Sequence, residues 1–137
     1  MKTRIKSHRL KAFSLTELLV VLVIVGILVL LALPNLMPLI SKAHSTEAKL
    51  QLEHVYTLQK TYFMEHSKYA ANLDEISFEQ EKLVDEGGTA KYVIELVEGG
   101  GNGFIARARA TVDFDGDGEL NIWEINQEKQ LTETVKD

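Results

Sequence analysis

The sequence predicts an α+β fold in which one long N-terminal transmembrane α-helix packs on a small antiparallel β-sheet. The helix is predicted by an apolar run over residues 18–40, followed over residues 41–67 by apolar positions spaced three and four apart. The sheet is predicted by short segments of alternating polarity between residues 92 and 135, separated by glycine-rich and acidic turns. We therefore expect one small domain attached to a membrane helix.

The apolar run marks a membrane span. It is 23 residues long with Asn35 as its only polar side chain, and a helix needs about twenty apolar residues to cross a bilayer core. Five positive charges and no acid lie within residues 1–12, so we expect the N-terminus in the cytoplasm and the rest of the chain beyond the membrane. A secretory signal peptide is the alternative, but its apolar region is usually about 7 to 15 residues long and ends near a small-x-small pair.

Glu17, just before the membrane segment, and Pro34, within it, are unusual residues at these places. A carboxylate beside a membrane helix is costly unless it finds a partner, so Glu17 indicates a functional site; a boundary residue at headgroup level is the alternative. Pro34 removes a backbone donor and clashes with the preceding turn, so we expect it to kink or locally melt the helix, with Pro38 as a second break. The alternative is that the paired prolines end the helix.

Residues 11–17, Lys-Ala-Phe-Ser-Leu-Thr-Glu, and the apolar run through Pro34 resemble the N-terminus of type IV pilins and pseudopilins. The resemblance implies that a prepilin peptidase cuts between Ala12 and Phe13 and that the new terminal amine of Phe13 is methylated. The family usually has glycine before the cut, where this chain has Ala12. Glu17 and Pro34 match the family's glutamate and its helix-kinking proline.

The resemblance also implies how the chain is organised and what it contacts. Residues 1–12 would be a cytoplasmic leader that is removed, residues 13–40 the membrane and assembly half of the helix, residues 41–67 its amphipathic half, and residues 68–137 a globular β domain in a pilin-like αβ roll. The protein would be a single-pass inner-membrane protein with its C-terminal domain in the periplasm or in an extracellular filament. Its partners would be copies of itself, prepilin peptidase, an inner-membrane assembly platform, other minor pilin-like subunits and membrane lipid.

A charge argument gives Glu17 a role in assembly. Cleavage would leave a positive amine at Phe13 in an apolar environment, where a buried charge must be paired. Glu17 can supply the counter-charge to the amine of a neighbouring subunit only when the two helices stand at one axial offset. We therefore expect this pair to set the register of assembly, with flexibility at Pro34 helping the helix to leave a bilayer and bend into a bundle.

The second half of the helix and the segment after it are predicted to pack on the sheet. The expected helix contacts are Ala48, Leu52, Val55, Leu58 and Tyr62. Residues 68–88 are expected to form a loop with a short helical turn, anchored by Tyr69, Leu73, Ile76 and Phe78. Strands are expected over residues 92–97, 104–112, 120–126 and 131–135. The alanines of the second strand should face the helix, and its arginines should face solvent.

Residues 113–124 match the twelve-residue template of a calcium-binding loop. The expected ligands are the carboxylates of Asp113, Asp115, Asp117 and Glu124, the backbone carbonyl of Glu119 and a water held by Asn121. Five acids within twelve residues repel one another unless a cation lies among them, and hard oxygen ligands suit calcium. The flanking strands weaken the assignment of Glu124 and leave the three aspartates as the main ligands; a solvated acidic turn is the alternative. The loop resembles the carboxy-terminal calcium loop of the major pseudopilin of type II secretion systems.

Charge and motif content argue against two other classes of function. After residue 12 the chain has ten basic and twenty acidic side chains, a charge of −10 that repels phosphate backbones, so we expect no nucleic-acid partner. No metalloprotease, nucleophile-elbow, phosphate-loop or dinucleotide motif occurs, and His44 with Glu47 is the only histidine–acid pair on one helical face. A solvated helix surface explains that pair better than zinc does. We predict no enzymatic activity.

Three functions remain. The first is a subunit of a type II secretion pseudopilus, which polymerises into a periplasmic filament for protein secretion. The second is a subunit of a type IV pilus for adhesion or motility, and the third is a membrane-anchored calcium-binding module that does not polymerise. The small domain, the absence of cysteine and the acidic loop favour the first. The third leaves Phe13 and Glu17 without a role.

Overall fold

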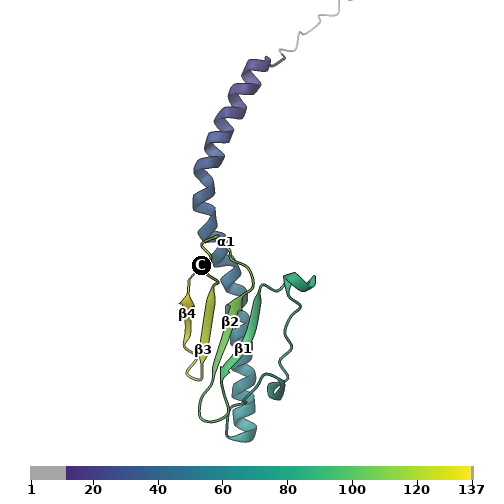
Figure 1. The fold of residues 1–137 in the computed structure, drawn as a ribbon, viewed down its shortest axis with the longest axis vertical. Coiled ribbons are helices and arrows are strands. Elements are labelled where there is room, and N and C mark those ends of the chain that lie inside the picture. The colour runs from purple at the N-terminus through teal and green to yellow at the C-terminus, as the bar shows by residue number, and fades with distance from the viewer. Residues whose placement is uncertain (1–11, 137) are drawn as a thin grey trace, which may run out of the picture. The chain divides into compact units, whose positions relative to one another are not determined.

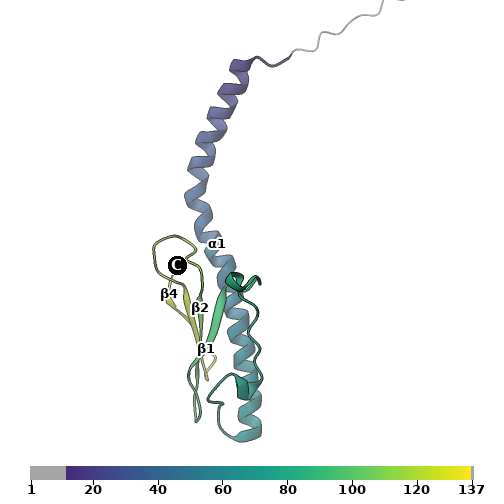
Figure 2. The same cartoon turned by 45° about the vertical axis from the view of Figure 1, so that its right-hand side comes forward.

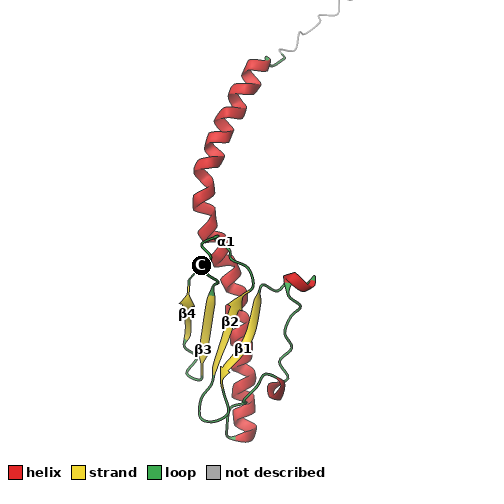
Figure 3. Ribbon diagram, viewed as in Figure 1, coloured by secondary structure: helices red, strands yellow, loops and turns green. Residues whose placement is uncertain are grey.

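A computed structural model describes residues 12–136. In chain order the elements are helix α1 (Leu15–His66), the 3-10 turns η1 (Asp74–Ile76) and η2 (Val84–Glu86), and strands β1 (Tyr92–Glu98), β2 (Ile105–Ala110), β3 (Ile122–Asn126) and β4 (Leu131–Val135) (Figure 1; Figure 3). The chain divides into two units, Met1–Leu36 and Met37–Asp137. A long apolar helix combined with an antiparallel sheet is the α+β class that the sequence predicts.

The first unit has no core of its own among the described residues, because every side chain from Ala12 to Pro34 is exposed. Leu33 is the best covered large apolar side chain of this stretch, and it is still 47% exposed. A single helix cannot bury its own apolar side chains, so this stretch needs lipid or protein around it. By length and composition, α1 is able to cross a membrane.

Helix α1 is continuous through Pro34. The local melting and the helix termination that the prolines could cause are therefore both absent within α1. The proline ring fixes φ near the helical value, so a helix can pass through it at the cost of one hydrogen bond and a local steric conflict. The strongly apolar residues on the N-terminal side of Pro34 favour the helical state over exposed backbone.

The second unit places helix and sheet in two layers. The four strands run antiparallel in the order β1-β2-β3-β4. The later turns of α1 cover one face of the sheet (Figure 2). Ala106, Ala108 and Ala110 of β2 alternate onto that face and are fully buried, while Arg107 and Arg109 alternate onto the other. The predicted orientation of β2 is confirmed, and its small side chains let the helix approach closely.

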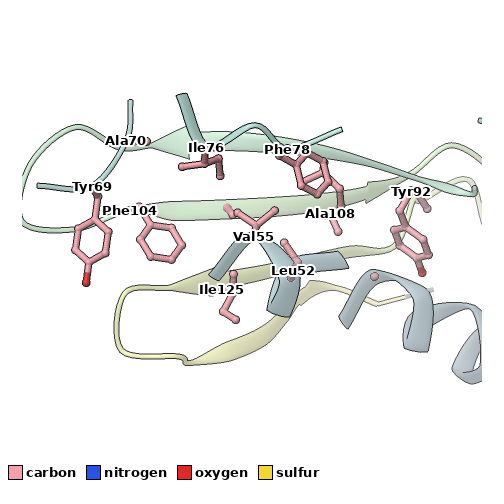
Figure 4. Close-up of a cluster of buried hydrophobic side chains, with 14 residues drawn as sticks. Leu52, Val55, Tyr69, Ala70, Ile76, Phe78, Tyr92, Phe104, Ala108 and Ile125 are labelled. Atoms are coloured by element: carbon pink, nitrogen blue, oxygen red, sulfur yellow. The ribbon is translucent and has the colours of Figure 1, made fainter. Parts of the chain in front are cut away.

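The core lies between α1 and the helix-facing side of the sheet (Figure 4). The predicted helix stripe is confirmed, since Ala48, Leu52 and Val55 are completely buried and Leu58 and Tyr62 pack at the margin of the core. The strands and the turn before β2 supply four more large buried side chains, Tyr92, Ile94, Phe104 and Ile125. Close packing of this kind makes each of these positions sensitive to a change in volume.

The segment between α1 and β1 is anchored as predicted. Tyr69, Ile76 and Phe78 are buried, and Leu73 is partly buried against the same core. The segment contains two 3-10 turns, η1 and η2, where the sequence predicts one short helical turn. Few anchors leave most of the backbone of this segment at the surface, where its polar groups remain solvated.

Two glutamine side chains fasten this segment on either side. Gln59 of α1 is fully buried; its Oε1 accepts from the Ala70 N–H at 2.9 Å and its Nε2 donates to the Ala70 carbonyl at 3.3 Å. Gln80 does the same for β1, accepting from the Ile94 N–H at 2.9 Å and donating to the Tyr92 carbonyl at 3.1 Å. The Gln80 amide thus bonds the outer edge of β1, which would otherwise expose unpaired backbone groups.

Candidate functional site

The first candidate region is the start of α1, where Ser14 and Glu17 form a capping box. The Ser14 backbone N–H donates to Glu17 Oε2 at 2.9 Å, and the Glu17 backbone N–H donates to Ser14 Oγ at 3.2 Å. The Ser14 hydroxyl also donates to Glu17 Oε2, at 3.2 Å. Reciprocal bonds of this kind satisfy N–H groups that the first turn of a helix leaves without partners.

The same geometry leaves Glu17 able to take a second partner. Both bonds that its carboxylate accepts end on Oε2, so Oε1 can still bind a cation. Ala12 and Phe13 precede the helix and are exposed, Phe13 by 80%, so the peptide bond between them lies where a peptidase can reach it. The structure therefore places the predicted cleavage point and the predicted assembly carboxylate at one end of α1.

The second candidate region is the loop between β2 and β3, where three aspartates converge. One carboxylate oxygen from each of Asp113, Asp115 and Asp117 lies within 4.8 Å of the others. Asp113 accepts from the backbone N–H groups of Gly116 at 2.6 Å and Gly118 at 2.8 Å. Both glycines have positive φ, 83° and 93°, which lets the chain fold around the Asp113 carboxylate.

The loop backbone orients these aspartates. The N–H of Gly118, more than any other group, holds the pKa of Asp113 below its usual value, so Asp113 is ionised at neutral pH. Asp115 accepts from the Asp117 N–H at 3.0 Å, and Asp117 accepts from the Glu119 N–H at 2.7 Å. Three carboxylates with hard oxygen atoms are a donor set that suits calcium.

Glu124, predicted as the last ligand of the loop, is engaged elsewhere. It lies in β3, and its Oε1 is 2.6 Å from Nη2 and 2.8 Å from Nε of Arg107 on β2. β3 begins at Ile122, and alternation along the strand turns Glu124 to the face opposite the helix. The three aspartates therefore converge, whereas Glu124 lies on a strand and does not join them. Glu119 stays beside them through its bond to Asp117.

Asn121, predicted to hold a water for the metal, is completely buried and bonded within the fold. Its Oδ1 accepts from the Tyr92 hydroxyl at 2.8 Å, and its Nδ2 donates to Glu133 Oε1 at 2.8 Å and to the Val135 carbonyl at 3.1 Å. One side chain thus joins the end of the acidic loop to β1 and β4. Buried networks of this kind fix geometry when every member is satisfied.

Phe114 fastens the acidic loop to α1. Its ring stacks on His44 with centroids 4.5 Å apart, and it lies 5.9 Å from the Tyr92 ring. Lys91 Nζ is 3.0 Å from the His44 ring nitrogens, and the Lys91 N–H donates to Glu47 Oε1 at 2.7 Å. Burial, and then Lys91, lower the pKa of His44, while Glu47 opposes them. His44 and Glu47, the histidine–acid pair on one helical face, therefore join α1 to Lys91, the residue before β1.

Comparison with known proteins identifies the N-terminal region. Residues 8–33 match the family model described as the prokaryotic N-terminal methylation motif. The chain is also 38% identical over 74 residues to the type IV major pilin protein PilA of Myxococcus xanthus (strain DK1622). This protein is thus similar to type IV pilins. The alignment covers 54% of the chain and 34% of PilA, so the pilin-like chain spans about a third of the length of that relative.

The matched motif contains the first candidate region of this pilin-like protein. Ala12, Phe13 and Glu17 all lie within residues 8–33, as does most of the exposed apolar part of α1. The motif and the apolar helix together indicate a single-pass membrane anchor. The acidic loop and the sheet lie outside the motif, so their role has to be argued from their own geometry.

Three features of these regions were missed at the level of the sequence. The spacing of Ser14 and Glu17 is a capping-box signal that could have been found there. The stacking of Phe114 on His44 has no such signal, because it joins distant parts of the chain. For Asn121, its place before a strand shows which residues share its face but does not show that the face is buried.

Proposed function

We propose that this pilin-like protein is a structural subunit of a filament. The observation that carries the proposal is the stretch from Ala12 to Pro34, whose side chains are all exposed, in a chain that has the methylation motif. Lipid covers such a helix before assembly, and copies of the same helix cover it in a filament. The role is structural, and no catalytic step is assigned to it.

In the filament, Glu17 pairs with the methylated amine of Phe13 of another copy, after a prepilin peptidase has cut between Ala12 and Phe13. Its Oε1 can accept that amine while Oε2 remains in the capping box. A carboxylate and an amine that are buried among helices must be paired, so the contact favours one axial offset. Pro34 supplies a weak point in the helix, since one backbone donor is missing there.

We assign the filament first to a type II secretion pseudopilus, anchored in the inner membrane with its sheet domain in the periplasm. A single four-stranded sheet and a sequence without cysteine support a small domain that has no disulfide-bounded loop. The convergence of Asp113, Asp115 and Asp117 supports the resemblance to the calcium loop of the major pseudopilin. The inner-membrane assembly platform and minor pilin-like subunits are then its expected partners.

A type IV pilus for adhesion or motility is the second candidate. The observation that favours it is the similarity to PilA, which extends over 74 residues and therefore beyond the 26 residues of the matched motif at 8–33. Both candidates share the anchored helix and the pairing at Glu17. They differ in where the filament grows and in what the cell loses without it.

A clean deletion in the source organism separates the two candidates. If exported proteins accumulate inside the cell while surface fibres persist, the pseudopilus assignment holds. If fibres vanish while export is normal, the protein is a pilus subunit. If both persist and the protein stays monomeric in the membrane, the filament proposal is wrong. Complementation with the wild-type gene is the control for effects on neighbouring genes.

We further propose that the acidic loop binds calcium through Asp113, Asp115 and Asp117, with the Glu119 carbonyl as an additional ligand. Bound calcium would neutralise the repulsion among the three carboxylates and hold the loop in one conformation. Asn121 and Glu124 then stabilise the fold: Asn121 donates to Glu133, and Glu124 pairs with Arg107 on the sheet. An affinity of about 0.1–1 mM is sufficient for a site outside the cytoplasm.

A further inference from the structure

A basic pocket lies where α1 meets the β3–β4 edge of the sheet. Its volume is about 350 Å³, and its lining includes Lys42, Lys49, Trp123, Glu133 and Lys136. Lys49 Nζ lies 4.2 Å from the centre of the Trp123 ring, which holds its ammonium group at the pocket wall. All five residues belong to the second unit, and neither the acidic loop nor the start of α1 uses them.

The pocket has an excess of positive charge and an unpaired donor. Three ammonium groups line it against one carboxylate, and that carboxylate, Glu133, already accepts from Asn121 at 2.8 Å. Both ion pairs found among residues 12–136 join arginines to glutamates on the other face of the sheet, so the three lysines have no acidic partner there. Trp123 Nε1 is buried and has no hydrogen-bond partner in the same range. Such a pocket suits a carboxylate from outside this copy.

An acidic segment lies at the opposite edge of the same unit. Along the chain between α1 and β1, six acidic side chains are exposed: Asp74, Glu75, Glu79, Glu81, Asp85 and Glu86. Two of them belong to η2, where Val84 is 42% exposed beside them. A bridge between Leu83 and Ala90 holds this part of the segment near β1. Figure 1 shows η2 next to β1, with β4 at the other edge of the sheet.

We infer that the basic pocket receives the η2 turn of a second copy of this chain, with Asp85 and Glu86 meeting the lysines. The two surfaces lie at opposite sheet edges, so one copy cannot bring them together. A contact between two different surfaces repeats from copy to copy. It generates a filament unless the rotation between copies closes a ring. Exposed Val84 adds an apolar contact for the lysine stems and the Trp123 ring.

This inference rests on the proposed filament function and adds a second contact to it. The apolar helix supplies most of the surface that assembly buries, but an apolar helix alone specifies register weakly. Complementary charges at the domain surface suppress wrong partners and fix the register between copies. The contact between the η2 turn and the basic pocket therefore fixes the register at the domain surface, as Glu17 fixes it at the start of the helix.

Paired cysteines test the contact directly, because the chain has no cysteine of its own. Val84→Cys and Lys136→Cys are placed in the full chain in the source organism, and filaments recovered from broken cells are oxidised and run on gels without reductant. The double variant should give a ladder of trimers and longer species. Each single variant can give at most a dimer and is the matched control. A double variant that gives no ladder from intact filaments overturns the inference.

Charge reversal in the cysteine double variant tests the chemistry. Lys49→Glu alone and Asp85→Lys alone should each reduce the ladder severalfold, and the two together should restore it. Lys68→Glu, an exposed lysine outside the pocket, should leave it unchanged. Equal ladders in all variants, or no rescue in the pair, would show that the contact is not made by these charges. If electron microscopy finds no filaments from the wild type either, the proposed function itself fails and the inference with it.

Discussion

The two halves of α1 both carry apolar side chains, and they differ in what covers them. From Leu18 to Leu33 the large apolar side chains are 47–74% exposed, whereas Leu52 and Val55 are completely buried against the sheet. The first half is apolar on all sides and the second only along one stripe. A stripe can be covered by one sheet, but a helix that is apolar all round needs lipid or other helices. The pattern of each half therefore predicts its partner.

The largest expected effect comes from removing the charge of Glu17 while keeping its capping role at the start of α1. Glu17→Gln should abolish filaments, because glutamine keeps the capping box but has no charge for the Phe13 amine. Ser14→Ala removes the cap, costs about 0.5–2 kcal/mol of helix stability, and should leave assembly largely intact. Filament yield and membrane insertion are measured for both. If the serine variant loses filaments and the glutamine variant keeps them, capping and not charge is the function of Glu17.

The second effect tests the contrast between the two halves directly. Leu52→Ala should reduce the free energy of unfolding of the sheet domain by about 2–5 kcal/mol, because a fully buried leucine leaves a cavity. Leu22→Ala, at a position 74% exposed, should leave that free energy unchanged. Denaturant unfolding of the full chain in detergent, followed by Trp123 fluorescence, measures both. Equal losses would show that the two units do not unfold separately.

The third effect concerns the buried hydrogen bond between Tyr92 and Asn121 at the end of the acidic loop. Asn121→Ala and Tyr92→Phe should each cost about 1–3 kcal/mol, since each leaves a buried polar group without its partner. The double variant should cost less than the sum of the two, with a coupling of roughly 0.5–3 kcal/mol. Strict additivity in the same unfolding measurement would mean that the hydrogen bond between them contributes no stability.

Much of the fold could be predicted because its signals are local. The strand predicted over residues 131–135 matches β4 at both ends, and the helix predicted to about Ser67 ends at His66. Periodicity of three and four or of two is written in neighbouring residues, so no knowledge of distant partners is needed. For the same reason the alternation in β2 sufficed to predict that its alanines face α1.

The parts that could not be predicted depend on pairing between distant segments. Alternation in β3 puts Trp123 and Glu124 on opposite faces, but it does not show which face meets the core. The pairing of Trp123 with Ala108 decides this, and it leaves Glu124 beside Arg107 and away from the three aspartates of the acidic loop. A template match along the chain cannot show a competing partner on another strand. The bond of Gln80 to Ile94 was invisible for the same reason.

The fourth effect concerns the loop that the three aspartates form. Calcium at millimolar concentration should raise the melting temperature of the wild-type chain, because a metal bound only by the folded state stabilises it. Asp117→Asn should remove most of that rise, and Glu124→Gln should keep it, since Glu124 pairs with Arg107. A calcium titration followed by thermal unfolding measures all three. If the glutamine variant loses the rise, Glu124 is a ligand after all and its pairing with Arg107 yields to the metal.

The smallest effect is a pH dependence at the contact between α1 and the acidic loop. Because the pKa of His44 in the folded chain lies below its ordinary 6.5, the unfolded chain binds the proton more readily. The stability that neutral His44 contributes is therefore present above pH 6.5 and is lost as the pH falls through the lowered pKa of His44 in the folded chain. The groups that face His44 are Lys91, Glu47 and Phe114, and of these Lys91 disfavours the proton most. His44→Gln should flatten the dependence of the unfolding free energy between pH 7.5 and 5, as measured by denaturant unfolding at each pH. An unchanged slope in the His44 variant would place the pH dependence elsewhere and would leave the Phe114 stack as a packing contact alone.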